Sequence, residues 1–213
     1  MSERPSPRIT SRKQPRQARS NELVTAILQA AVQVLAKEGM RRFTTTRVAE
    51  RAGVSVGSVY QYFPNKAAIL FRLQSDEWQQ TSDMLCAIVE DRAHPLLVRL
   101  RTLVRAFVRS ECDEAAVRVA LNDAAPLYRD APQAREVRAA GRRTFELFIE
   151  EALPEASAST RALACELIGM TLGSVGKTYS ESPRTEAEIE VYADAMADMF
   201  CAYLKTLGAV GRA

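Results

Sequence analysis

Apolar side chains recur at three- and four-residue intervals along most of the chain, and this spacing places them on one face of a helix. The first stripe lies within residues 21–38 and consists of Leu23, Ile27, Ala30, Ala31, Val34 and Leu35. Gly39 follows the stripe and is a typical helix end. Two short helices are predicted at residues 46–52 and 56–63, and a longer helix is predicted to begin at Lys66.

Helical spacing continues from Lys66 almost to the last residue. Prolines and polar clusters interrupt it near residues 94–95, 111–113, 125–126, 131–132, 153–159 and 180–184. No stretch combines alternating β-branched residues with the turn residues of a hairpin, so the pattern predicts an all-α protein of about nine helices. The longest uncharged runs have 14 residues, fewer than the ~18 of a membrane-spanning helix, and we expect no membrane partner.

The composition narrows the class of protein. Of the 213 residues, 47% are hydrophobic, as in ordinary globular domains. There is one histidine, His94, and the four cysteines are far apart at Cys86, Cys112, Cys165 and Cys201. Cysteines so scattered indicate small core residues in a reducing, cytoplasmic setting, with a thiol switch as the alternative. A single histidine supplies neither an ordinary zinc site nor a Ser/His/Asp group, so the sequence predicts no metal, no cofactor and no hydrolytic site.

Charge is divided unevenly along the chain. The whole chain carries a net +3, but residues 1–72 carry 13 Lys and Arg against 4 Asp and Glu, a net +9. The remaining 141 residues carry a net −6. A basic region concentrates near polyanions, of which nucleic acid is the most common. The division favours a nucleic-acid partner for the first third, and a chance distribution of charge is the alternative.

Residues 1–20 are predicted to form a flexible basic arm. They contain six basic residues and three prolines, and after the initiator Ile9 is their one large aliphatic residue. Such a segment cannot bury enough apolar surface to fold. It either lies along DNA phosphates or in a minor groove, or it is only a disordered terminus.

The segment from Phe43 to Lys66 carries the most informative pattern, FTTTRVAERAGVSVGSVYQYFPNK. Two short helices joined by a tight glycine-containing turn form a helix-turn-helix, in which Gly53 permits positive φ and Ser55 caps the second helix. The residues expected to pack inward are Val48, Ala49, Ala52, Val54, Val59 and Phe63. The residues expected to face outward on the second helix are Val56, Gly57, Ser58, Gln61 and Tyr62. This face has no carboxylate to repel phosphates, so it suits a DNA major groove.

The same segment resembles the N-terminal domain of the TetR family of bacterial transcriptional regulators, and the resemblance extends over about residues 20–72. That family has a threonine-led helix, then Ala-Gly-Val-Ser, a small residue, Tyr-x-Tyr/His-Phe and a lysine. The matching positions are Thr44 or Thr45, Ala52, Gly53, Val54, Ser55, Gly57, Tyr60, Tyr62, Phe63 and Lys66.

The resemblance implies roles in DNA binding for these residues. Thr45 corresponds to a hydroxyl on a phosphate, Thr46 to a base contact in some members, and Arg47 to a phosphate or base contact. Val56, Gly57 and Ser58 would enter the groove, and Gln61 would read a base. Tyr60, Tyr62 and Lys66 correspond to contacts with the DNA backbone.

Simpler roles remain open for three of these positions. Thr44 is a helix cap in any case. Tyr60 follows Val59 directly and is either partly in the core or on a phosphate. Arg41 and Arg42 are expected to be solvated.

The resemblance implies that the remaining residues, 67–213, form a helical domain for dimerisation and effector binding. Two helix-turn-helix units on a palindromic operator require a dimer. The expected interface lies on the last two helices, at Leu163, Leu167, Met170, Gly173, Tyr192, Met196, Met199 and Tyr203. Packing within one subunit is the alternative for these helices. Three glycines in the first of them, at 169, 173 and 176, indicate close helix approach.

Aromatic residues of the middle helices are candidates for an effector cavity or for ordinary core: Trp78, Phe107, Tyr128, Phe145 and Phe148. Arg101, Arg105 and Arg109 recur every four residues and are expected to form a solvated face.

The predicted organisation is therefore an arm at residues 1–20, a three-helix DNA-binding domain at 21–66 and a helical domain at 67–213. The predicted function is a dimeric, cytoplasmic, ligand-responsive repressor, released from its double-stranded DNA operator by a small apolar or amphipathic effector. The alternatives are an all-α small-molecule-binding enzyme and a sequence-nonspecific architectural DNA-binding protein.

Overall fold

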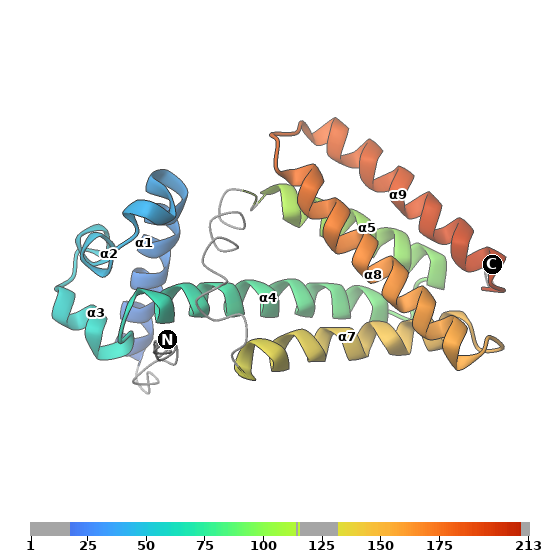
Figure 1. Cartoon of the computed structure of the whole chain (residues 1–213), viewed down its shortest axis with the longest axis horizontal. Helices are drawn as coiled ribbons and strands as arrows, with labels where there is room; N and C mark the ends of the chain where they lie inside the picture. The colour runs from blue at the N-terminus through green and yellow to red at the C-terminus, as the bar shows by residue number, and fades with distance from the viewer. Residues whose placement is uncertain (1–17, 114, 116–131, 210–213) are drawn as a thin grey trace, which may run out of the picture. The chain divides into compact units, whose positions relative to one another are not determined.

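The computed structural model describes residues 18–113, 115 and 132–209, and it contains eight α-helices and no strand within these ranges (Figure 1). The helices are α1 (Ala18–Arg42), α2 (Thr45–Ala52), α3 (Val56–Tyr62), α4 (Lys66–Glu90), α5 (Leu96–Asp113), α7 (Pro132–Ala152), α8 (Ala158–Ser180) and α9 (Glu186–Thr206). The all-α prediction is confirmed. The first 17 residues of the predicted arm lie outside the described residues, and α1 already begins at Ala18.

The chain divides into two compact units. Among the described residues, one comprises residues 18–77 and 132–135, and the other comprises residues 78–113, 115 and 136–209. Helix α4 begins in the first unit and ends in the second.

The first unit is built on a small apolar core beneath α1, α2 and α3. Ile27 and Leu35 of α1, Val48 of α2 and Val59 of α3 are almost completely buried, and Phe63 follows α3 into the same core. The stripe predicted at residues 21–38 is therefore the buried face of α1. The helix is kinked at the predicted end, because Gly39 has φ 71° and ψ 173°.

Within α1, Ser20–Arg42 is long and apolar enough to cross a membrane by length and composition alone. Its apolar positions Ile27, Ala31 and Leu35 are buried in the core of the first unit. The core of a folded domain accounts for the apolar composition of this helix.

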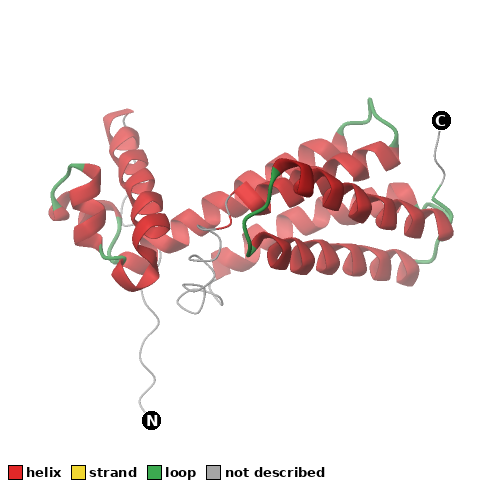
Figure 2. Ribbon diagram, turned by 90° about the horizontal axis from the view of Figure 1, so that it is seen from above, coloured by secondary structure: helices red, strands yellow, loops and turns green. Residues whose placement is uncertain are grey.

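The second unit packs α5 against both α8 and α9 (Figure 1), and α7 contributes to the same core. Figure 2 shows loops and turns joining the described helices, with no strand among them. The most deeply buried side chains come from all four helices and include Leu100, Val104, Val108, Phe148, Ile149, Ile168, Phe200 and Leu204. A capping box fixes the start of α9, where the Thr185 hydroxyl accepts a hydrogen bond from the Glu188 amide and the Glu188 carboxylate accepts one from the Thr185 amide.

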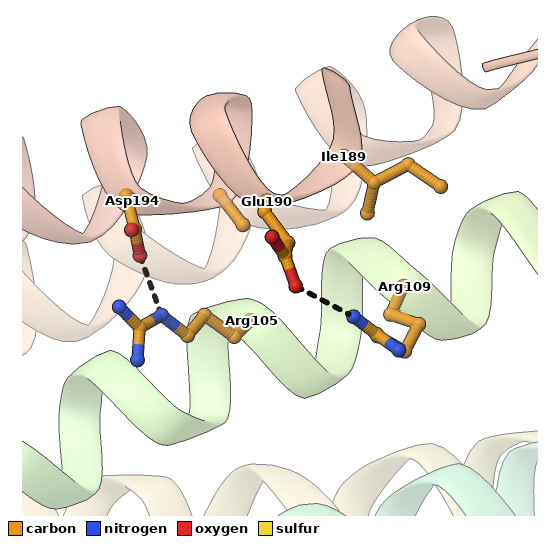
Figure 3. A pocket seen from close by; sticks show the side chains of 6 residues that line it. Arg105, Arg109, Ile189, Glu190 and Asp194 are labelled. Carbon is orange, nitrogen blue, oxygen red and sulfur yellow. Dashed lines mark hydrogen bonds and ion pairs between the residues drawn. The ribbon is translucent and has the colours of Figure 1, made fainter. Parts of the chain in front are cut away.

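The arginines expected to form a solvated face of α5 are exposed at Arg105 and Arg109 and half-buried at Arg101, and all three also pair with acidic side chains of α9. Arg101 pairs with Asp198, and Arg105 donates from Nε to Oδ1 of Asp194 at 2.5 Å. Arg109 pairs with Glu186, and its guanidinium also lies 3.7 Å from Glu190 (Figure 3). The hydrogen bond from Arg105 lowers the pKa of the Asp194 carboxyl. These partly exposed pairs are individually weak, but their four-residue repeat matches α5 to α9 in one register.

Gly176 lies where α8 packs closely against α5. A Cβ added to Gly176 would stand 2.9 Å from Cε1 of Phe107. Gly169 and Gly173 have open space around them within the chain. Close packing inside the subunit therefore explains one of the three glycines of α8.

Gly176→Ala should lower the free energy of unfolding by about 1 kcal/mol, because overpacking of the contact with Phe107 outweighs the gain in helix propensity. Chemical denaturation monitored by circular dichroism measures the change. Adding Phe107→Leu should recover part of the lost stability, since the smaller side chain leaves room for the methyl. A single Gly176→Ala variant as stable as the wild type would contradict this account.

Candidate nucleic-acid interface

Both helices of the predicted helix-turn-helix have the expected local caps. The Thr44 hydroxyl accepts a hydrogen bond from the Arg47 amide at 3.2 Å, and the Ser55 hydroxyl accepts one from the Ser58 amide at 3.0 Å. Gly53 ends α2 with φ 68° and ψ 29°, a left-handed conformation that glycine adopts at little cost. The capping roles predicted for Thr44, Gly53 and Ser55 are confirmed.

The outer face of α3 consists of small and uncharged polar side chains. Gly57, Tyr60 and Gln61 are exposed, and Val56 and Ser58 are half-buried at the start of the helix. Tyr60 is 40% exposed, which decides between its two predicted positions in favour of the surface. This face therefore offers hydroxyl and amide groups with no carboxylate.

The predicted outward direction of Tyr62 is wrong. This side chain is only 5% exposed. Tyr62 lies three residues after the buried Val59, on nearly the same side of the helix, so its ring joins the core. Its proposed contact with the DNA backbone stays a prediction.

Two hydroxyl groups from different helices meet beside this face. Oγ1 of Thr45, at the first position of α2, lies 3.2 Å from the phenolic oxygen of Tyr60 on α3. Thr46 is exposed on the next position of α2. A pair of adjacent exposed hydroxyls can donate to the oxygens of one phosphate.

Lys66 adds the positive charge at the edge of this unit. It is exposed at the first position of α4, where the Asn65 side chain accepts a hydrogen bond from the Ala68 amide at 2.9 Å. An ammonium beside a helix N-terminus favours an anion there. The arrangement suits a DNA phosphate.

The two arginines of α2 are held by side chains of α1. Arg47 forms an ion pair with Glu38, and Nε of Arg51 donates to Oε1 of Gln33 at 2.6 Å. Arg41 and Arg42 are exposed at the end of α1. The sequence pattern of α2 alone did not indicate the Glu38 and Gln33 contacts, because both partners lie on another helix.

The predicted interface residues of the second unit are mostly exposed. Large apolar side chains are exposed at Leu163, Leu167 and Met170 of α8 and at Met199 of α9, and Gly173 of α8 is also exposed. Tyr192 and Tyr203 are half-buried, and the Tyr192 ring stacks on Tyr179 of the same chain at 3.8 Å between centroids.

Met196 was expected at this interface, and the structure corrects its position. It is 6% exposed and points into the core of its own subunit, because it shares the inner face of α9 with Ala193 and Phe200. Val191, which was not among the expected interface residues, is 72% exposed on α9. An apolar residue beside the expected interface position Tyr192 was the available signal.

Of the aromatic residues expected in an effector cavity or in ordinary core, Phe107, Phe145 and Phe148 pack in the core of the second unit. Phe148 is buried and stacks with Phe145 at 5.9 Å between centroids, and the Arg99 guanidinium lies 5.4 Å from its ring centroid. Phe148 therefore takes the core position that was one of its two expected positions, and contact of these aromatic residues with an effector stays a prediction. Trp78, Phe107 and Phe145 are half-buried, and Tyr128 lies outside the described residues.

A pocket of about 270 Å³ lies between α5 and α9, beside the arginine row (Figure 3). Its lining residues are Arg105, Arg109, Ile189, Glu190, Ala193 and Asp194, and none of the predicted aromatic residues is among them. Its arginines already pair with its carboxylates, so this groove belongs to the contact between the two helices.

The cysteines give no sign of reactive chemistry. Burial raises the pKa of the Cys112, Cys165 and Cys201 thiols, which disfavours the reactive thiolate. Within the described ranges, no three His, Cys, Asp or Glu side chains gather as metal ligands would.

Two protein-family models together match most of the chain. Residues 27–73 match "Bacterial regulatory proteins, tetR family", and residues 95–207 match "Tetracyclin repressor-like, C-terminal domain". The first match covers the helix-turn-helix, and the second covers more than half of the sequence.

Two individual relatives share part of the sequence, and a solved structure shares the fold. The chain is 33% identical over 67 residues to the "Fatty acid metabolism regulator protein" of Bacillus subtilis, covering 32% of this chain and 34% of that protein. It is 33% identical over 90 residues to the "HTH-type transcriptional regulator TtgR" of Pseudomonas putida, covering 41% of this chain and 42% of that protein. The chain thus matches less than half the length of these two relatives.

The crystal structure of "FadR from Bacillus subtilis in complex with stearoyl-CoA" has the same fold, with a TM-score of 0.62 and 18% identity over 86% of this chain and 96% of that one. With both of its domains matched to one family, the chain belongs to the TetR family of bacterial regulatory proteins.

Proposed function

We propose that the protein is a transcriptional repressor that binds a palindromic operator as a dimer and is released by a small effector. The observation that carries this proposal is the surface of the first unit, where the outer face of α3 adjoins the Thr45–Tyr60 hydroxyl pair. Membership in a family of bacterial regulatory proteins supports it.

The outer face of α3 and the residues that contact DNA phosphates have separate roles in binding. Gly57 at the start of α3 lets the helix backbone approach base edges closely, and the Gln61 amide can both donate to and accept from a base. The Thr45 and Tyr60 hydroxyls and the Lys66 ammonium bind phosphates, which fix the position of α3 in the groove. Base contacts then supply sequence preference, and phosphate contacts supply most of the affinity.

A second copy of the chain is the proposed occupant of the apolar face of α8 and α9. One short recognition helix contacts few base pairs, so a dimer on two half-sites is needed for specificity. Leu163 and Met170 are 59% and 63% exposed, which is unusual for side chains of this size. The open space around Gly173 leaves room for a helix of the partner to approach α8 closely.

The proposed effector is apolar or amphipathic and acts through α4. This helix begins with Lys66 of the proposed DNA contact and continues into the second unit. An effector that binds better to the DNA-released state would displace Lys66 and weaken operator binding by that difference in affinity. The related FadR in complex with stearoyl-CoA supports an effector with a long apolar part.

We infer a cytoplasmic location, because the operator of a bacterial regulator lies there. The regulator names of the matched relatives favour binding over catalysis. An all-α enzyme is therefore not favoured.

A Tyr60→Phe and Lys66→Gln double variant should bind its DNA about a hundredfold more weakly than the wild type, because two phosphate contacts are lost while the helices remain. Fluorescence anisotropy with DNA selected by the wild-type protein measures this loss. Lys205→Gln in the second unit is the matched control and should bind normally. Undiminished binding by the double variant would refute the assignment, and equal wild-type affinity for random duplex would instead favour an architectural protein.

Met170→Glu should weaken the dimer by roughly a hundredfold or more, because the carboxylate would be buried against the apolar partner face. Sedimentation velocity over a range of concentrations measures the dimer dissociation constant. Val98→Glu is the matched control, since Val98 is an exposed apolar residue on α5 outside the proposed interface. Equal dissociation constants for Met170→Glu and the wild type would place the interface elsewhere.

A further inference from the structure

The two arginines of α2 differ in the charge of their partners. Arg47 pairs with the carboxylate of Glu38, whereas Arg51 donates to the neutral amide oxygen of Gln33. Both partners lie on the same helix, α1. The net charge of one pair is zero, and that of the other is positive.

Arg47 is close to the hydroxyl groups proposed to hold DNA phosphates. It occupies the first turn of α2, two residues after Thr45, and its amide donates to Thr44. Its side chain is 39% exposed and that of Glu38 is 28% exposed. The ion pair therefore lies at the surface, where a long arginine side chain can change partners.

We propose that Glu38 is an internal competitor for Arg47, and that Arg47 exchanges this carboxylate for a DNA phosphate on binding. The inference rests on the proposed DNA-binding function and assigns Glu38 a part in setting the affinity. In the free protein the carboxylate neutralises Arg47. In the complex the phosphate takes its place, and Glu38 is left beside an anion.

The strengths of the two interactions make the exchange feasible. Ion pairs between exposed groups are weak, because water and salt screen them. A guanidinium can bind a phosphate through two parallel hydrogen bonds, and that contact also releases a counterion from the DNA. The exchange costs affinity in proportion to the strength of the pair that must be broken.

The second pair indicates that α2 can be held to α1 without a carboxylate. The amide oxygen of Gln33 accepts from Arg51 at 2.6 Å across the same two helices. Glu38→Gln therefore keeps an acceptor of the same size beside Arg47 and removes only its charge. This makes Glu38→Gln a direct test of competition.

Glu38→Gln should bind DNA about two- to fivefold more tightly than the wild type, the range expected for removal of a surface ion pair. In an Arg47→Gln background the same substitution should give no gain. Anisotropy titrations with a fluorescent duplex of random sequence, 30 base pairs long, measure all four proteins. Melting curves by circular dichroism confirm that each variant folds.

Two controls separate this mechanism from a general effect of charge. Glu50→Gln removes an exposed carboxylate of α2 and should change the affinity equally in both Arg47 backgrounds. Arg47→Gln should reduce the steepness of log Kd against log salt by about 0.9, as expected for one lost phosphate contact.

An equal gain from Glu38→Gln in both backgrounds would overturn the proposal, as would an unchanged salt slope in Arg47→Gln. A loss of affinity in Glu38→Gln would also overturn it and show that the pair positions α2. Absence of DNA binding by the wild-type protein would instead refute the proposed function.

Discussion

The apolar core beneath α2 and α3 is the constraint on which the proposed DNA surface depends. These helices have only eight and seven residues, and helices of that length are unstable alone in water. Packing of α2 on α1 and of α3 on α2, with Val48, Val59 and Phe63 buried, fixes the direction of each, and Gly53 sets the turn between them. The position of every outward side chain follows from this packing. The meeting of the Thr45 and Tyr60 hydroxyls, from residues fifteen positions apart, is its clearest result.

The ion pairs in the structure change the interpretation of the uneven charge along the chain. The acidic character of the second unit is concentrated in part on one edge of α9, where Asp194 and Asp198 pair with the arginines of α5. These carboxylates serve the packing of one subunit, and the opposite side of α9 stays apolar. In the first unit an ion pair with Glu38 likewise holds Arg47, so part of the positive charge of that unit is already neutralised. The net charge of each region indicated that the basic and acidic regions have different roles. It did not indicate which charged side chains are already held in ion pairs.

Features that depend on residues within one helix could be predicted from the sequence, whereas most contacts between helices could not. The caps at Thr44 and Ser55, the turn at Gly53 and the buried stripe of α1 all follow from short-range chemistry, and the structure confirms them. Tyr62 was misplaced because seven residues define the buried side of a helix poorly. The partners of Arg101 and Arg105 lie 97 and 89 residues away along the chain. Phe148 was left open between core and effector cavity because helical spacing cannot separate the two, and the structure shows it buried in the core.

The most direct test of the central claim is selection of DNA by the purified protein from a pool of random duplexes, followed by sequencing of the bound fraction. We expect a palindrome whose half-sites are separated by about one helical turn, or a multiple of it, because two copies of α3 must enter successive major grooves. A bound fraction with no common sequence would contradict the account, and so would a single asymmetric site without a related second half.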